Sequence, residues 1–163
     1  MLQIKGVCIM SASHYIQEAL LQLIQQKEYE KITITDIAKR AGVTRISFYR
    51  NFDSKDAILE LALKSAFQAY QTEHGTDLSF SALFAFFQQN KSLIDCLYKS
   101  EKEILIAQLL TDKQSLSTLP TEVAYSYAFV GYSILGACTA WYQRGMVDTA
   151  EEITRIMDQQ KSS

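Results

Sequence analysis

The chain has 163 residues, of which 48% are hydrophobic, and its 16 Lys and Arg against 18 Asp and Glu give a net charge of −2. This size and apolar content suit one compact helical domain or two small ones that share a core. The cysteines Cys8, Cys96 and Cys138 are odd in number and widely spaced, and the two histidines are far apart, so we expect no disulfide scaffold, no metal site and a reducing cytoplasmic location.

The first ten residues are apolar with one lysine, but their longest uncharged run, Gly6 to Ala12, is too short for a signal peptide or a membrane span. Two interpretations stay open: residues 1–9 form an arm of the native chain, or translation starts at Met10. Apolar residues at helical spacing then predict a first helix over Ser13 to Lys27.

The segment from Thr33 to Phe52 predicts two short helices joined by a tight turn, which is a helix-turn-helix. Thr33 is expected to cap the first helix, with Asp36 three residues later reaching back to the cap. Gly42 tolerates the positive φ that ends a helix, and Thr44 is expected to cap the second helix.

Phe48 and Phe52 lie four residues apart and are expected to pack the second helix onto the first. In such a motif the second helix enters the major groove with its N-terminal residues nearest the base edges. Arg45 has the chemistry for a bidentate contact with guanine, and Ile46 can pack on a thymine methyl group. Lys55, at the start of the following helix, suits a phosphate.

From about Ile16 to Leu63 the sequence resembles the DNA-binding domain of the TetR/AcrR family of transcriptional regulators, through the pattern I-T-x-x-D-I-A-x-x-A-G-V-T-x-x-x-F-Y-R-x-F-x-S-K. Two positions depart from the family: Glu28 stands where glycine is usual, and Asn51 replaces a commoner histidine. The resemblance implies binding to a double-stranded DNA operator through eight residues: Thr33, Thr44, Arg45, Ile46, Ser47, Tyr49, Asn51 and Lys55.

The charge distribution agrees with this interpretation. Up to Lys55 the chain has eight Lys and Arg against five acidic residues, whereas the remainder has eight against thirteen. A basic N-terminal part on an acidic body is expected if only one end of the molecule meets phosphates.

Beyond the predicted DNA-binding domain (residues 11–55), helical spacing of apolar residues predicts a linking helix over residues 56–74, which ends at the break His74 to Asp77. A body is expected over residues 78–160. An aromatic helix is predicted to begin at Ser79 or Ser81, Asn90 to Ser92 to interrupt it, and Leu93 to Leu110 to form a further helical stretch. Residues 111–119 are expected to form a turn, with Pro120 starting the next helix.

The most apolar segment follows. From Val123 to Tyr142 no residue is charged, which is long enough for a membrane span. Tyrosines spread along the run and the lack of a flanking basic cluster argue against a membrane. We therefore expect a helix over residues 121–144 that packs on its own body with one face and on a second subunit with the other. Thr149 and Glu152 predict a capping box at the start of the last helix.

The W-Y-x-x-G-M motif from Trp141 to Met146 resembles the C-terminal region of a Firmicute-type branch of the TetR family that includes regulators of dihydroxyacetone kinase operons. The resemblance implies that the helices over residues 121–144 and 149–160 pair with those of a second subunit in a four-helix bundle.

The sequence thus predicts an all-α protein: a three-helix DNA-binding domain followed by a helical dimerisation and effector domain. The expected function is that of a homodimeric TetR-type regulator. The resemblance implies a repressor, which a small apolar or aromatic molecule releases from a palindromic operator. Six aromatic residues are candidates for lining a pocket for that molecule: Phe67, Phe84, Phe87, Tyr98, Tyr127 and Trp141. Their helical spacing favours the simpler interpretation that they form the core.

Two other function classes are alternatives to a DNA-binding regulator. An enzyme is not expected, because the sequence has no recognisable nucleophile turn or Gly-rich phosphate loop, and no cofactor is expected. The other class is a co-regulator or helical interaction protein whose body binds a protein partner. Arg45 and Lys55 argue against the loss of DNA binding, because neither is expected to be needed to hold the DNA-binding domain together.

Overall fold

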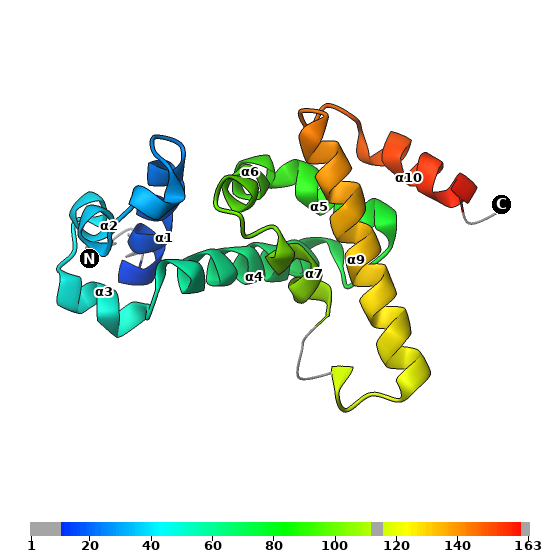
Figure 1. Ribbon diagram of the computed structural model, residues 1–163, viewed down its shortest axis with the longest axis horizontal. Coiled ribbons are helices and arrows are strands. Elements are labelled where there is room, and N and C mark those ends of the chain that lie inside the picture. The colour runs from blue at the N-terminus through cyan, green and yellow to red at the C-terminus, as the bar shows by residue number, and fades with distance from the viewer. Residues whose placement is uncertain (1–10, 112–115, 161–163) are drawn as a thin grey trace, which may run out of the picture. The chain divides into compact units, whose positions relative to one another are not determined.

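The structure, a computed structural model, describes residues 11–111 and 116–160. It is all-α in this described part, as predicted, and divides into two compact units within one helix, between Leu59 and Glu60. We call the unit up to Leu59 the head and the unit from Glu60 the body. The elements are α1 (Ala12–Ile24), the 3-10 helix η1 (Tyr29–Lys31), α2 (Ile34–Ala41), α3 (Arg45–Asn51), α4 (Lys55–His74), α5 (Phe80–Gln89), α6 (Lys91–Lys99), α7 (Ile104–Leu110), α9 (Thr121–Gln143) and α10 (Ala150–Gln160) (Figure 1).

In the head, α1, α2 and α3 pack on one another around a small apolar core. Ile16 and Leu20 of α1, Ile37 of α2 and Phe48 of α3 have no exposed surface. Helix α1 begins at Ala12 because the Ser11 hydroxyl accepts a hydrogen bond from the His14 backbone N–H, and it ends three residues before the predicted Lys27. Tyr29 and Ile32, which are 4% and 2% exposed, close the core.

Helix α4 starts in the head and ends in the body. It stops at His74, and Gly75 follows with a φ of 89°, which confirms the predicted break. Within the body, Phe67 and Tyr70 of α4 contact the ring of Phe86 on α5, with centroids 5.2 and 5.5 Å apart. The C-terminal half of α4 is therefore part of the body core.

The prediction of one helical stretch from Leu93 to Leu110 was wrong, because the structure has two helices there, α6 and α7. Between them Glu101 has a φ of 54°, and the Lys102 backbone N–H donates to the Leu97 carbonyl at 2.8 Å. The Ser100 hydroxyl also donates to the Cys96 carbonyl at 2.7 Å. A short polar turn thus interrupts an apolar pattern that continues on both sides. The predicted interruption before α6 is confirmed and is a single residue, Asn90.

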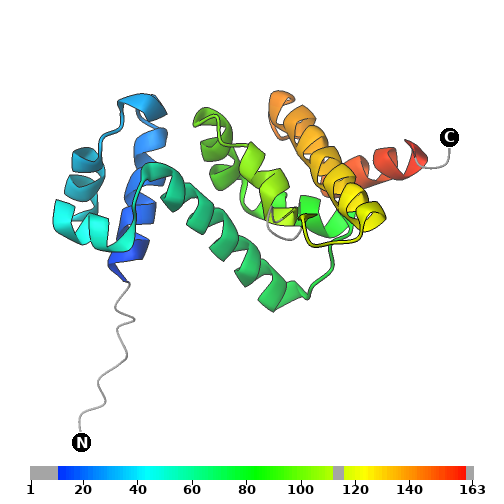
Figure 2. The same ribbon diagram turned by 60° about the horizontal axis from the view of Figure 1, so that its bottom comes forward.

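Helix α9 begins directly after Pro120, as predicted, and packs against α7 (Figures 1 and 2). Its buried side consists of Gly131, Ile134, Cys138 and Trp141. The two helices cross closely at Gly131, where an added Cβ would lie 2.6 Å from the Thr111 methyl group. A larger residue at this position would push α9 away from α7.

The opposite side of α9 is exposed. The side chains of Tyr125 and Phe129 are each 75% accessible, and only 17% of the most apolar window of the helix is buried. In the described residues α9 is the one helix whose length and composition would allow it to cross a membrane. The body therefore covers one face of α9, and the predicted burial of its other face is not met within a single chain.

Helix α10 begins as predicted. The Glu152 backbone N–H donates to the Thr149 hydroxyl at 3.2 Å, and the Thr149 N–H donates to the Glu152 carboxylate at 2.9 Å, which completes the capping box. The hypothesis on residues 1–9 falls outside the described part, and so do residues 112–115 of the predicted 111–119 turn.

Candidate nucleic-acid interface

The N-terminus of α2 is fixed by a complete capping box. The Asp36 backbone N–H donates to the Thr33 hydroxyl at 3.1 Å, and the Thr33 N–H donates to the Asp36 carboxylate at 2.8 Å. Lys27, just after α1, also donates to that carboxylate at 2.8 Å. The hydrogen bonds from Lys27 and then from Thr33 lower the pKa of Asp36, so the carboxylate stays charged and ties α2 to the end of α1.

The turn between α2 and α3 has the geometry that the sequence predicted. Gly42 has a φ of 68°, and its N–H donates to the carbonyls of the last turn of α2. The Val43 N–H donates to the Ala38 carbonyl at 3.0 Å, which closes the turn. The Thr44 hydroxyl accepts from the Ser47 N–H at 3.0 Å, so α3 begins immediately.

Helix α3 has one buried and one exposed side. Phe48 is fully buried and Phe52, just after the helix, is 5% exposed, which confirms the predicted apolar stripe. Ile46 is 67% exposed and Tyr49 49% exposed. Arg45 is also exposed and forms no hydrogen bond or ion pair with another group in the described part of the protein. Arg45, Ile46 and Tyr49 are thus available to a partner molecule.

Other residues predicted to contact DNA are engaged within the head. The Thr33 hydroxyl donates to Asp36 while it accepts from the backbone. The Asn51 amide donates to the Ser47 carbonyl at 2.7 Å. The Thr44 hydroxyl accepts a backbone N–H and can still donate its own hydrogen.

Lys55 has a structural role that the sequence did not indicate. Its ammonium donates to the Tyr29 carbonyl at 2.8 Å and lies 4.2 Å from the centre of the Tyr29 ring. The Tyr29 hydroxyl in turn donates to Asp56 at 2.5 Å, and burial together with Asp56 raises the pKa of the phenol. The expectation that Lys55 is not needed to hold the domain together was therefore wrong. An ammonium has three N–H donors, so Lys55 can bind a phosphate as well.

The set of eight residues omitted an exposed cation of α3. Arg50 lies on α3, next to Tyr49 in sequence, and forms no hydrogen bond or ion pair with the rest of the described chain. Its charge and its position in the second helix were visible in the sequence. The link from Tyr29 to Asp56 was not, because it joins residues 27 positions apart.

The six aromatic residues predicted for an effector pocket do not form one group. Phe67, Phe84, Phe87 and Trp141 are buried in the body core. The Phe84 ring contacts those of Phe87 and Trp141, with centroids 5.4 and 6.1 Å apart. Tyr98 is half-buried, stacks on Tyr142 and shares a hydrogen bond of 2.9 Å with Thr139, whereas Tyr127 is 51% exposed.

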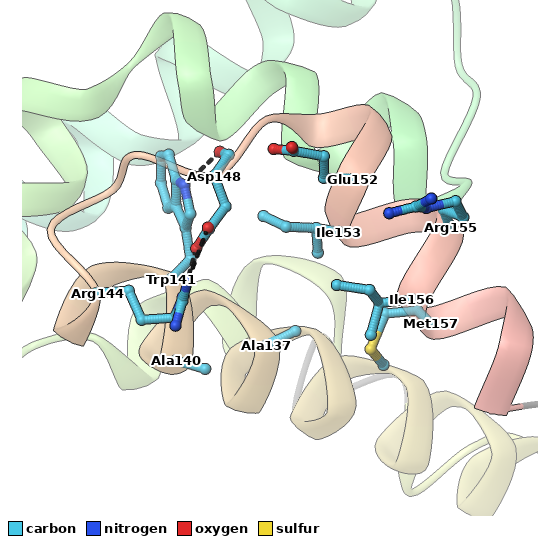
Figure 3. Close-up of a pocket in the computed structure, with 10 residues that line it drawn as sticks. All are labelled: Ala137, Ala140, Trp141, Arg144, Asp148, Glu152, Ile153, Arg155, Ile156 and Met157. Atoms are coloured by element: carbon cyan, nitrogen blue, oxygen red, sulfur yellow. Dashed lines mark hydrogen bonds and ion pairs between the residues drawn. The ribbon is translucent and has the colours of Figure 1, made fainter.

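A cavity of about 300 Å³ lies between α9 and α10 (Figure 3). Of the six aromatic residues, Trp141 lines it, and its indole N–H donates to the Asp148 carbonyl at 3.0 Å. Arg144 forms an ion pair of 2.7 Å with the Asp148 carboxylate at the same end. The rest of the lining comes from both helices: Ala137, Ala140, Glu152, Ile153, Arg155, Ile156 and Met157.

Comparisons with known proteins concern mainly the head. Residues 16–62 match the profile of the bacterial regulatory proteins of the tetR family. A segment of 71 residues is 31% identical to IcaR of Staphylococcus aureus, described as an HTH-type negative transcriptional regulator of the biofilm operon icaADBC. That match covers 40% of this chain and 38% of IcaR, so the chain matches less than half the length of this curated relative.

Two solved structures extend the similarity of fold to the whole chain. Lin0861 from Listeria innocua superposes with a TM-score of 0.74 at 17% identity and covers 97% of this chain and 95% of its own. The fatty acid degradation regulator FadR from Bacillus halodurans gives a TM-score of 0.55 at 15% identity, with 96% and 95% covered. At these identities the similarity concerns the fold. The match of residues 16–62 and the capped α2–turn–α3 geometry identify this segment as a helix-turn-helix domain of the kind found in the tetR family of bacterial regulatory proteins.

Proposed function

We propose that the protein is a DNA-binding transcriptional regulator of the TetR type, a cytoplasmic homodimer that represses transcription from a near-palindromic operator. One observation carries the proposal: Arg45, Ile46 and Tyr49 are exposed on a helix that buried Phe48 fixes in a capped helix-turn-helix. Repression is supported by IcaR, which is described as a negative regulator.

A homodimer would present two recognition helices to the DNA. Two-fold symmetry then requires matching half-sites, separated by about one turn of the double helix or a multiple of it. The exposed apolar face of α9 supports a second subunit at that position, rather than a membrane. The motif from Trp141 to Met146 supports the branch that includes dihydroxyacetone kinase operon regulators.

The signal that releases DNA has two candidates. A small apolar or aromatic effector bound in the body would need different affinities for the DNA-competent and incompetent states, with a coupling of about 1–3 kcal/mol. The close packing of Phe84, Phe87 and Trp141 in the core supports the second candidate, a protein co-regulator that binds the surface of the body.

The variant Arg45→Ala tests the base contact. We expect it to cost about 1–3 kcal/mol at one base position and to relax preference there, because a bidentate contact with guanine is lost. Fluorescence anisotropy with operator duplexes that differ at single positions measures this. Arg50→Ala is the matched control on the same helix and should weaken binding to all duplexes alike. An Arg45→Ala protein with the parent's base preferences would refute the assignment.

The variant Lys55→Ala should have two effects. Loss of one phosphate contact would weaken binding to every sequence and reduce the slope of log K against log salt by about one. Loss of the hydrogen bond to the Tyr29 carbonyl would also lower the free energy of unfolding by about 1–3 kcal/mol. Salt titrations and thermal unfolding separate the two effects, with Lys55→Arg as the control that keeps the charge. Lower stability with an unchanged salt slope would show that Lys55 only holds the head together.

A further inference from the structure

A stripe of exposed residues runs along α9 on the side away from its buried residues, in addition to the exposed Val123, Tyr127 and Val130. Tyr125, Phe129, Tyr132, Gly136 and Ala140 follow one another at steps of four, three, four and four residues, which keeps them on one face of a helix. Each of these five residues is exposed in the single chain. The stripe is apolar apart from the tyrosine hydroxyls, which is unusual for a surface in contact with water.

The stripe is divided by side-chain size. Its N-terminal half carries three aromatic rings, and its C-terminal half carries Gly136 and Ala140. An added Cβ at Gly136 would meet no atom within 4 Å, in contrast to Gly131 on the buried side. A glycine inside a helix costs about 0.5–1 kcal/mol relative to alanine. Because the fold of the single chain does not require Gly136, another surface that approaches this side of α9 closely would account for it.

A two-fold axis relates the large residues to the small ones. If the axis passes between Tyr132 and Ser133, perpendicular to α9, two copies of the helix lie antiparallel. Phe129 and Gly136 are then equally far from the axis and face each other across the pair. Tyr125 and Ala140 are likewise equally far from it. The rings of Tyr125 and Phe129 therefore each meet a small residue of the second copy, as close helix packing requires, while Tyr132 lies beside the axis.

A parallel arrangement of the two helices lacks this complementarity. It would place Phe129 against Phe129 and Gly136 against Gly136, which crowds one end of the contact and leaves a void at the other. Voids and overpacking both cost stability, typically about 1–3 kcal/mol for overpacked side chains. The order of side chains along α9 thus selects the antiparallel arrangement.

The cavity between α9 and α10 lies where this arrangement needs space. Ala137 and Ala140 lie beside Trp141 on its α9 side, and the apolar residues of α10 point toward them (Figure 3): Ile153, Ile156 and Met157. In the antiparallel pair the partner's Tyr125 reaches Ala140 and can place its ring in this apolar cavity. A buried aromatic ring removes about 150–250 Å² of surface from water, which makes it a typical anchor of an interface.

The charges at the ends of α9 fit the same arrangement. Glu122 lies in the first turn of the helix and Arg144 directly follows its last residue. The antiparallel arrangement brings Glu122 near the partner's Arg144, whose side chain is 66% exposed beside Asp148. A parallel arrangement would bring like charges together instead.

We infer that two copies of this chain pair through α9 in an antiparallel arrangement, with Phe129 of each copy against the partner's Gly136 and Tyr125 in the partner's α9–α10 cavity. This inference rests on the proposed homodimer and specifies its register. It also makes the cavity a binding site for the partner's side chain, not for a small effector.

Disulfide cross-linking tests the register in a background in which Cys8 is replaced by Ser. Tyr132→Cys, beside the axis, should form an intermolecular disulfide under mild oxidation. Tyr125→Cys alone should not, because two copies of residue 125 would lie about 22 Å apart at a rise of 1.5 Å per residue. Tyr125→Cys combined with Ala140→Cys should cross-link. Native Cys96 and Cys138 are buried, and the Cys8→Ser background without added cysteines controls for them.

Exchanging the large Phe129 and the small Gly136 gives an independent test of the register. Gly136→Phe should raise the dimer dissociation constant at least tenfold, because a ring would meet the partner's Phe129. The double variant Phe129→Gly with Gly136→Phe should restore dimerisation to within a few-fold of the parent. Circular dichroism should show all these variants folded, since a Cβ added at Gly136, which is exposed, meets no atom within 4 Å in the single chain.

The parent protein's mass, measured by light scattering over a range of concentrations, distinguishes a wrong antiparallel register from a wrong homodimer proposal. A dimer that cross-links through Tyr125→Cys alone, or that the double variant fails to restore, would overturn the antiparallel register and leave the dimer standing. A parent that is monomeric at all concentrations would overturn both proposals. A parent that binds lipid vesicles through α9 would show that a membrane covers this face.

Discussion

Replacing Phe48 with Ala is expected to lower the free energy of unfolding of the head by about 3–5 kcal/mol, the usual cost of removing a buried phenylalanine ring. Phe48 is fully buried and lies on the short helix α3, which has only seven residues. So short a helix is not stable alone in water and depends on packing. Without the Phe48 ring, the cap at Thr44 would remain as the main local support of α3.

The same variant should abolish specific DNA binding, because the exposed residues of α3 would no longer be held in position. Thermal unfolding followed by circular dichroism, together with anisotropy on operator DNA, measures both effects. Ile46→Ala is the matched control: Ile46 is 67% exposed, so its loss should change stability by no more than about 0.5 kcal/mol while it still weakens DNA binding. If Phe48→Ala unfolds like the parent, α3 is not anchored as described.

Replacing Trp141 with Ala should destabilise the body by a similar amount, about 3–5 kcal/mol. The indole is 1% exposed, packs edge-on against Phe84, and donates to the Asp148 carbonyl between α9 and α10. Its removal leaves a cavity and an unpaired carbonyl. Total stabilities of about 5–15 kcal/mol are typical, so a loss of this size is severe.

The structure changes the meaning of this variant. From the sequence, loss of Trp141 would shift the protein toward monomer if the last helices form the interface. The structure places Trp141 on the buried side of α9, away from the exposed stripe, so Trp141→Ala should act first through folding, although Trp141 also lines the α9–α10 cavity. Trp141→Phe, which keeps a ring but loses the hydrogen bond, should cost only about 1 kcal/mol. Denaturant unfolding at a fixed protein concentration measures the free energy of unfolding of both variants. Equal free energies for Trp141→Ala and the parent would contradict the burial of the Trp141 indole in the body core.

Features set by short stretches of sequence were predictable. The capping boxes at Thr33 and Thr149, the positive φ of Gly42 and the start of α9 after Pro120 each depend on residues within four positions of one another. Local hydrogen bonding and backbone sterics decide such features before tertiary packing does.

Features set by distant residues were not predictable in the same way. The turn at Glu101 interrupts apolar periodicity that continues into α7, so spacing alone joined two helices. Lys55 looked like a free cation because its partner, the Tyr29 carbonyl, lies 26 positions away. Periodicity also indicated that α9 is apolar all round, but only the structure shows which face its own body covers and which face it exposes.

The candidate site was predicted as a helix and a set of residues, not as a geometry. Arg45, Ile46 and Tyr49 are exposed as expected. Asn51 was expected to face DNA, but its amide donates to the Ser47 carbonyl in this structure. Side-chain alternatives of this kind are decided by local competition between backbone and solvent partners.

We propose that this protein reads a specific DNA sequence through α3. Fluorescence-anisotropy binding to the DNA that flanks its own gene, at several salt concentrations and with random DNA as competitor, is the test of this proposal. We expect a steep dependence on salt and a clear preference for one near-palindromic site. Equal and weak affinity for flanking and random DNA at every salt concentration would contradict the claim.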